Sequence, residues 1–239
     1  MLGEQFSDPL DRFWNLYLVD AEKADKKLTD GWKGDTDGIL IFTGLFATTV
    51  ASFIIAVTPS LAPDSDADTV ALLRQISQQL SGTNSTWPSV PLPSQSFQPS
   101  PSLVRINTLW FLTLFLSLSC ALAATLVQQW TRLYLADSQP RGSPRKRGPI
   151  HAYLRVGIER FGLADAVDMI VTLLHVSVFL FLAGLLDYSF TIHSTIAHSL
   201  LGAVLTGGLV YITLTIFPVL FIDCPYKTPA TPIIRLLKR

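Results

Sequence analysis

The chain has 239 residues, of which 49% are hydrophobic and only 15% charged, with 18 basic and 18 acidic side chains. Ordinary soluble domains carry about 25% charged residues, so this deficit favours a membrane protein. The balanced charge argues against nucleic acid as a partner, because nucleic-acid-binding proteins carry a basic excess. Two cysteines are too few for the disulfide framework that stabilises a small secreted domain.

Residues 1–37 form a polar N-terminal segment of mixed charge, and four apolar runs follow it. A helix that spans a bilayer needs about 20 mostly apolar residues. The predicted spans are residues 38–57, 106–127, 169–186 and 196–222. A soluble helical core is the alternative, but soluble helices show a polar face and these runs show almost none. The predicted fold is therefore all-α, an integral membrane bundle of four transmembrane helices within residues 38–222.

Lysine and arginine alternate in number between the segments that the spans separate. Successive segments, beginning with the N-terminal one, contain 5, 2, 7, 0 and 4 of these residues. Positively charged segments stay in the cytoplasm. We therefore expect both termini, the basic 128–168 loop and the 223–239 tail to be cytoplasmic, and the 58–105 loop to be lumenal or extracellular. The pattern specifies no particular membrane.

The 58–105 loop contains a glycosylation sequon at Asn84, followed by Ser85 and Thr86. Glycosylation occurs on the lumenal side, so this candidate site agrees with the charge pattern. Residues 66–82 of the same loop have apolar side chains at helical spacing, which predicts a short amphipathic helix.

The stretch SPRKRGP places three consecutive cations, Arg145, Lys146 and Arg147, in the basic loop. We interpret them as a topology anchor that faces the anionic cytoplasmic leaflet, where each cation contributes about 1 kcal/mol. A nuclear import signal is the alternative, and the position between two spans disfavours it.

Residues 149–167 predict a second amphipathic helix, which either lies on the cytoplasmic leaflet or packs under the bundle. Its predicted apolar stripe consists of Ile150, Leu154, Ile158 and Phe161. Arg155 and Glu159 are spaced to form an ion pair on another face.

An intramembrane polar stripe is predicted on the third span. Asp168, Thr172 and His175 share one face of this helix. An ionisable group within a bilayer costs about 3 kcal/mol and is a functional hypothesis by default. One interpretation is a stripe that handles protons or cations. The other is structural: Asp168 favours the helix dipole, and neutral His175 bonds a neighbouring helix.

Small and polar residues recur every three or four positions along three spans, and such faces let helices approach closely. These residues are Thr113, Ser117, Cys120, Ala121, Ala124 and Gln128 on the second span, Ala47 and Ala51 on the first, and Ala203 and Gly207 on the fourth. They favour a packed bundle and contacts with a second copy or another membrane protein. Cys224, at the cytoplasmic end of the fourth span, is a candidate for S-acylation.

The sequence contains no recognisable catalytic, cofactor-binding or metal-binding constellation. We therefore expect no enzymatic activity and no cofactor. The leading hypothesis is a non-enzymatic membrane scaffold or interaction module, with the lipid bilayer as its surroundings. The alternative is a small transporter or channel subunit that uses the third-span stripe. A lipid-modifying enzyme fits least well.

Several sequence blocks in order resemble a fungal family of membrane proteins, the domain-of-unknown-function 6535 family. The blocks are GWKGDTDGILIFTGLFATTVASFIIAV, LLRQISQQL, NTLWFLTLFLSLSCALAATLVQQW, HAYLRVGIERFGL, LLHVSVFLFLAGLLDY and CPYKTPATP. Together they cover roughly residues 14–232. The resemblance implies a multi-pass membrane domain and implies no substrate, cofactor or catalytic residue.

Overall fold

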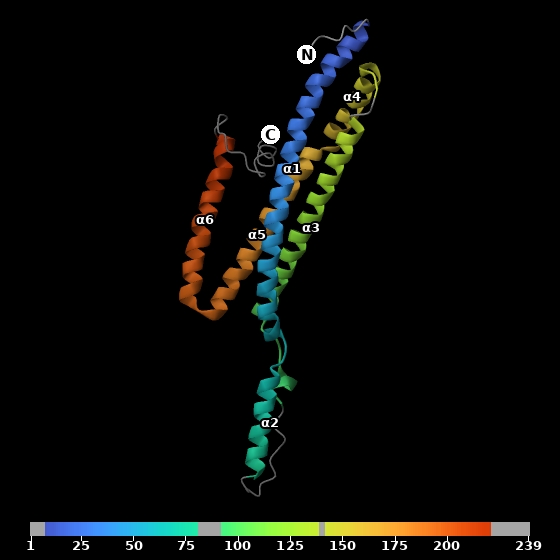
Figure 1. The fold of residues 1–239 in the computed structure, drawn as a ribbon. Helices are drawn as coiled ribbons and strands as arrows, with labels where there is room; N and C mark the ends of the chain where they lie inside the picture. Colours follow the sequence, from blue (N-terminus) through green and yellow to red (C-terminus); the bar gives the residue numbers. More distant parts are fainter. Residues whose placement is uncertain (1–7, 81–91, 139–141, 221–239) are drawn as a thin grey trace. The chain divides into compact units, whose positions relative to one another are not determined.

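The computed structural model describes residues 8–80, 92–138 and 142–220, and all regular structure in these ranges is helical (Figure 1). The helices are α1 (Pro9–Val57), α2 (Ser65–Leu80), α3 (Pro101–Ser138), α4 (Pro144–Phe161), α5 (Leu163–Ile192) and α6 (Ser194–Leu220), with two short 3-10 helices, η1 (Thr58–Leu61) and η2 (Pro93–Ser96). Four helical stretches in the described residues are long and apolar enough to cross a membrane. The predicted all-α class with four such helices is confirmed.

Each predicted span lies on one long helix. Residues 38–57 lie on α1, 106–127 on α3 and 169–186 on α5, while the run 196–222 begins in α6 and continues two residues beyond the described part. This agreement has a physical basis, because a backbone in lipid must satisfy its hydrogen bonds internally and a helix does so residue by residue.

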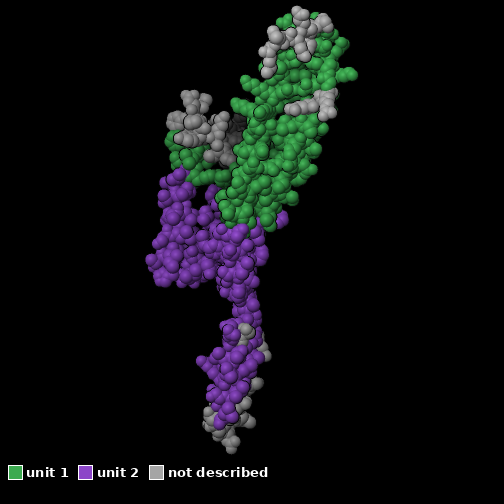
Figure 2. All heavy atoms as spheres, in the orientation of Figure 1, with its two compact units in different colours: residues 1–47, 116–176, 211–239 green, residues 48–115, 177–210 purple. Residues whose placement is uncertain are grey.

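The chain divides into two compact units (Figure 2). Unit 1 comprises residues 1–47, 116–176 and 211–239, and unit 2 comprises residues 48–115 and 177–210. Each unit has its own buried core.

The core of unit 1 is formed by α1, α3 and α5. Its buried side chains are Trp32 and Ile39 of α1, Cys120, Ala124 and Val127 of α3, and Val167, Ile170 and Leu174 of α5. Within each helix these positions are separated by three, four or seven residues, the spacing of helices that pack at a shallow angle. The predicted small-residue face of the second span thus lies partly in this core, because Cys120 and Ala124 are both fully buried.

The polar N-terminal segment continues the first span as one helix. Residues 9–37 of α1 extend about 43 Å beyond the apolar run, at about 1.5 Å per residue. Leu18, Asp25 and Thr29 are buried on this extension at the same spacing as Trp32 and Ile39. The extension is therefore a packed structural element, which the polar composition of residues 1–37 did not predict.

Helix α4 begins earlier and ends earlier than the predicted helix 149–167. Its first turn contains the three consecutive cations, and it ends where Gly162 adopts a left-handed conformation with φ of 62°. Glycine takes this conformation without strain, so Gly162 separates α4 from α5. The predicted apolar stripe holds only in part, since Ile150 and Phe161 are exposed and Ile158 packs against the core.

Unit 2 is organised around Trp110 of α3, which is fully buried. Its indole ring contacts Phe53 of α1 and both Phe181 and Tyr188 of α5, at centroid distances of 5.4, 6.3 and 5.5 Å. Gly184 admits this ring, because a Cβ there would lie 2.6 Å from the indole Nε1. Near the same end of α3, Arg105 binds Asp187 through two bonds of 2.8 and 2.9 Å.

Helices α2 and α6 bury few side chains. The predicted helix at residues 66–82 is confirmed as α2, and its apolar residues Val70, Leu73 and Ile76 are exposed. In the apolar window of α6 only 6% of residues are buried, against 33% for α3. Ala203 and Gly207, predicted to pack closely, lie on exposed positions of α6.

Candidate functional site

The most elaborate arrangement of polar side chains lies in unit 1, on the extension of α1. Asp25 of α1 is 3% exposed, and three side chains from two other helices reach its carboxylate. Tyr134 of α3 donates to Oδ2 at 2.5 Å, and His151 of α4 approaches the same oxygen through Nε2 at 2.8 Å. Arg155 of α4 donates to the other oxygen, Oδ1. One buried carboxylate thus joins three helices.

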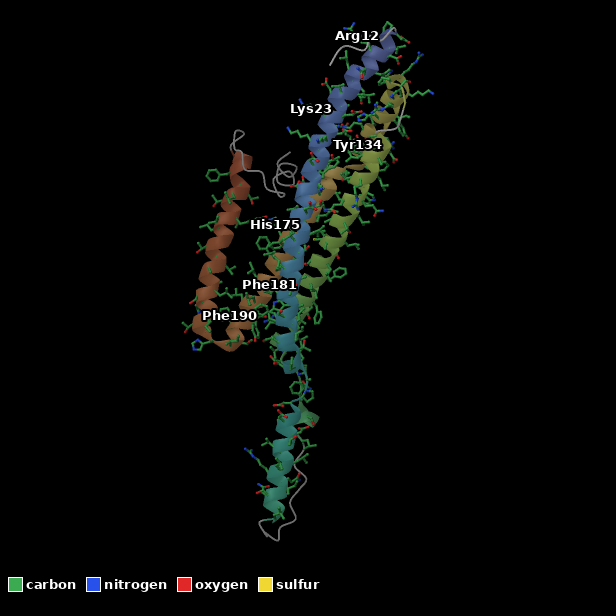
Figure 3. The ribbon with its side chains drawn as sticks, viewed as in Figure 1. Arg12, Lys23, Tyr134, His175, Phe181 and Phe190 are labelled. Atoms are coloured by element: carbon green, nitrogen blue, oxygen red, sulfur yellow. The ribbon has the colours of Figure 1, made fainter. Side chains whose placement is uncertain are left out.

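The orientation of His151 extends this arrangement to Tyr17 of α1. A carboxylate only accepts hydrogen bonds, so Nε2 of the imidazole, which faces Asp25, carries a proton. The other ring nitrogen, Nδ1, lies 3.2 Å from the hydroxyl oxygen of Tyr17. We refer to Tyr17, Asp25, Tyr134, His151 and Arg155 as the polar cluster. Tyr134 is labelled in Figure 3.

An ion pair lies within the polar cluster. The carboxylate of Asp25 is matched by the guanidinium of Arg155, which also bonds Glu159 at 3.3 Å and so confirms that predicted pair. Burial raises the pKa of Tyr134 well above its ordinary value, and its hydrogen bond to Asp25 raises that pKa further. The phenol therefore stays protonated and remains a donor. Such satisfied networks fix one arrangement of helices, because the same groups unpaired would be costly to bury.

Little space is left between the side chains that meet at Asp25. The cavity beside it, lined by Asp25, Trp32, Tyr134 and Arg155 among others, has a volume of about 10 Å³. A single water needs at least about that volume. Although a carboxylate, an imidazole and a phenol are the groups of acid–base catalysis, here they bind one another. We therefore interpret the polar cluster as a set of structural contacts that hold α1, α3 and α4 together.

The topology anchor predicted at Arg145, Lys146 and Arg147 forms the first turn of α4. Arg145 binds Asp8 at 3.2 Å, and Arg147 binds Glu22 of α1. Cations at a helix N-terminus oppose the helix dipole, and these two carboxylates offset that cost. Two of the three cations therefore tie α4 to the N-terminal part of the chain, while Lys146 is exposed. The sequence alone did not suggest this second use.

Close packing accompanies these ion pairs. A Cβ added to Gly148 of α4 would lie 2.1 Å from Cε3 of Trp14, so the indole rests directly on the glycine backbone. Trp14 contacts Tyr17 edge to face, and Tyr17 contacts His151 in the same way, at centroid distances of 5.6 Å. Glycine at position 148 therefore allows α4 to approach α1 beside the polar cluster.

The predicted stripe on the third span makes its hydrogen bonds within its own helix. Thr172 donates to the carbonyl of Asp168 at 2.8 Å, and Nδ1 of His175 lies 2.6 Å from the carbonyl oxygen of Val171. The half-buried ring of His175, which is labelled in Figure 3, also lies 5.5 Å from the ring of Tyr211 on α6. The three residues are aligned as predicted, and among the described residues their hydrogen bonds do not connect them to another helix.

The other predicted positions are placed as follows. Gln128 of the small-residue face bonds Thr36 at 3.2 Å and Asp37 at 2.6 Å. Asn84 and Cys224 lie outside the described residues. Across the described ranges, no group of three or more histidine, cysteine, aspartate or glutamate side chains is arranged to hold a metal ion.

The polar cluster was not predicted from the sequence, although the sequence contains a signal for it. Asp25, Thr29, Trp32 and Thr36 follow one another by four, three and four residues, which is the spacing of a buried helix face. A carboxylate in such a stripe, on a segment without apolar periodicity, indicates a buried partner elsewhere in the chain. His151 and Arg155 also share one face of α4, four residues apart.

Comparison with other proteins adds one finding. Neither the curated proteins nor the solved structures give a match. The model of a family of unknown function, DUF6535, matches residues 14–191, which is 178 of the 239 residues. The match ends before the block CPYKTPATP, and it includes all five residues of the polar cluster. The chain belongs to the DUF6535 family of unknown function.

Proposed function

We propose that this protein is a multi-pass membrane scaffold, in which four helices anchor a rigid helical extension that presents a surface to other proteins. The observation that carries the proposal is the polar cluster. Its ionisable groups bind one another, and the cavity beside them has a volume of only about 10 Å³, so they serve to hold α1, α3 and α4 together. A rigid, non-catalytic extension suits an interaction module better than an enzyme.

Aromatic residues support the membrane placement. Trp130 of α3 lies three residues beyond the apolar run and is 48% exposed, and Phe161 at the end of α4 is 86% exposed. Both line an apolar groove of about 450 Å³ together with Tyr153, Val156 and Leu163. Tryptophan and tyrosine gather at membrane–water interfaces. We therefore place the membrane boundary near Gln128 and Asp37, with the polar cluster beyond it on the cytoplasmic side.

Proximity labelling in cells tests the scaffold proposal. The full chain would carry a labelling enzyme at its N-terminus. Wild type would be compared with Asp25→Asn, which weakens the contacts that hold the extension of α1 to α3 and α4. Asp20→Asn, an exposed aspartate on the same helix, is the control. We expect a specific set of labelled proteins that Asp25→Asn loses and Asp20→Asn keeps. An identical labelled set for all three proteins would contradict the proposal.

A transporter or channel subunit is the second candidate. It is favoured by one observation, the half-buried His175 within the third span beside Tyr211. Its test is ion and proton flux in reconstituted vesicles with wild type and His175→Ala. Flux above background that depends on His175 would favour transport over the scaffold. Equal background-level flux in both would rule out the transport hypothesis.

A further inference from the structure

A second cavity in unit 1 lies between α1 and α3, on the side of the polar cluster that is nearer to the apolar runs of these helices. It has a volume of about 340 Å³, and its polar lining includes Asp30 and Lys33 of α1 and Gln128, Thr131 and Arg132 of α3. We refer to it as the interhelical cavity. Ligand sites commonly have volumes of about 300 to 1,000 Å³, so its size suits a small polar group.

Two cations at the interhelical cavity lack an acidic partner in the described part of the chain. Arg105, Arg145, Arg147 and Arg155 all form ion pairs, whereas no ion pair involves Lys33 or Arg132. Both side chains are exposed, and both line the same opening with the carboxylate of Asp30. The cavity therefore offers two positive charges and one negative charge to a ligand.

The position of the interhelical cavity along the helices is defined by Gln128. This residue follows the apolar run of α3 directly, and its amide bonds Thr36 and Asp37 at the start of the apolar run of α1. Lys33 lies five residues before the apolar run of α1, and Arg132 lies five residues after the apolar run of α3, which is about 7 Å along a helix. If the apolar runs cross a bilayer as proposed above, this is the level of the lipid headgroups.

We propose that the interhelical cavity binds the headgroup of an amino phospholipid such as phosphatidylethanolamine. Lys33 and Arg132 bind its phosphate, and Asp30 binds its ammonium group. Basic pockets between transmembrane helices are known to bind lipid headgroups, and a charge-assisted hydrogen bond is roughly twice as strong as a neutral one. The carboxylate of Asp30 distinguishes this cavity from a site for a purely anionic lipid. This inference rests on the proposed membrane insertion.

The test is lipid binding to the purified full-length protein by native mass spectrometry. Phosphatidylethanolamine is compared with phosphatidylglycerol, which has the phosphate and lacks the amine. We expect the wild type to bind phosphatidylethanolamine more tightly. Lys33→Gln with Arg132→Gln should weaken both lipids by about tenfold or more, since a hydrogen bond to a charged group contributes about 1.5–3 kcal/mol. Asp30→Asn should remove only the preference for the amine.

Two controls separate the explanations. Lys23→Gln with Lys27→Gln removes two exposed cations of α1 outside the cavity, and it should leave binding unchanged (Lys23 is labelled in Figure 3). Lys33→Arg should retain binding because it retains the charge. Displacement of the lipid by inorganic phosphate as readily as by glycerophosphoethanolamine would overturn the assignment to a lipid headgroup.

The membrane proposal is checked separately by alkaline carbonate extraction of each variant. Recovery of wild type in the soluble fraction would refute membrane insertion itself. If the Lys33→Gln, Arg132→Gln protein stays in the membrane and binds both lipids as the wild type does, the headgroup site is refuted and membrane insertion is not. The headgroup site is also refuted if Lys23→Gln with Lys27→Gln weakens lipid binding to the same extent, because any surface cation would then suffice.

Discussion

At the scale of single residues, Asp25 has the largest expected effect on stability. Its carboxylate accepts from Tyr134 and binds His151 and Arg155 while almost fully buried. Polar groups in such a position are favourable only as a complete set, since removal of one partner leaves the others buried and unpaired.

We expect Asp25→Asn to lower the free energy of unfolding by about 3 kcal/mol, the lower end of the range for a broken buried ion pair, because Arg155 is partly exposed. The measurement is thermal unfolding in a mild detergent. Asp20→Asn, on the exposed side of α1, is the matched control and should unfold as the wild type does. Equal midpoints for both variants would show that the polar cluster does not stabilise the fold.

Tyr134 should make stability fall at alkaline pH. Burial has the larger effect on the pKa of Tyr134 in the folded protein and raises it, and the hydrogen bond to Asp25 raises it further. Unfolded tyrosine loses its proton near pH 10. Above that pH the unfolded state binds fewer protons than the folded state, so stability decreases as pH rises towards the folded pKa.

The check compares unfolding midpoints of wild type and Tyr134→Phe at pH 8 and pH 10.5. We expect the wild type to lose more stability over this interval than the variant does. Tyr153→Phe, which changes an 80% exposed tyrosine, should retain the wild-type dependence. A wild-type dependence in Tyr134→Phe would contradict the assignment.

At the scale of elements, the contact between α1 and α4 depends on a glycine. Gly148 lies directly against Trp14, whereas a Cβ placed on Gly157 of the same helix would contact no described residue beyond the surrounding backbone of α4. Helix propensity alone would favour alanine at both positions by about 1 kcal/mol. At position 148 the packing of Trp14 reverses this preference, so glycine is favoured over alanine there.

We therefore expect Gly148→Ala to destabilise the protein by about 2 kcal/mol, a typical cost of overpacking, and Gly157→Ala to be neutral or slightly stabilising. Thermal unfolding measures the stability of both variants. Tryptophan fluorescence is an added readout, because Gly148→Ala changes the surroundings of Trp14. A Gly148→Ala protein as stable as Gly157→Ala would show that α4 does not pack closely on α1.

The contacts between helices explain why the buried face of α4 was only partly predicted. Its apolar residues suggested a stripe through Ile150 and Phe161, yet the packed face carries Gly148, His151 and Ile158. The buried polar partners on α1 and α3 select that face. Apolar periodicity alone does not contain this information, because it ignores hydrogen bonds to distant residues.

At the scale of the whole molecule, the orientation in the membrane is the main prediction. The alternation of lysine and arginine along the chain predicts that the 58–105 loop lies outside and the 128–168 loop inside. In the structure two cations of the 128–168 loop bind carboxylates of the N-terminal part of the chain. If the apolar helices cross a membrane, this ion pairing requires both segments to lie on the same side of it, and the orientation itself stays a prediction.

Glycosylation mapping measures the orientation directly. We expect the wild type, expressed in a eukaryotic host, to show a glycosidase-sensitive mobility shift that Asn84→Gln abolishes. A sequon introduced within residues 136–144 should stay unmodified. Glycosylation of that engineered sequon would reverse the topology and with it the interpretation of Arg145, Lys146 and Arg147 as a cytoplasmic anchor.

The sequence by itself predicted the four apolar helices of this protein, because long apolar runs become helices where no water can pair with the backbone. It did not predict that residues 9–37 continue the first of these helices, or that Gly162 separates α4 from α5. The tertiary structure alone decided the polar cluster and the interhelical cavity. Asp25 is separated from Tyr134, His151 and Arg155 by 109, 126 and 130 residues. On a polar segment each of these side chains is compatible with exposure to solvent, and only the packing of α1, α3 and α4 buries them together.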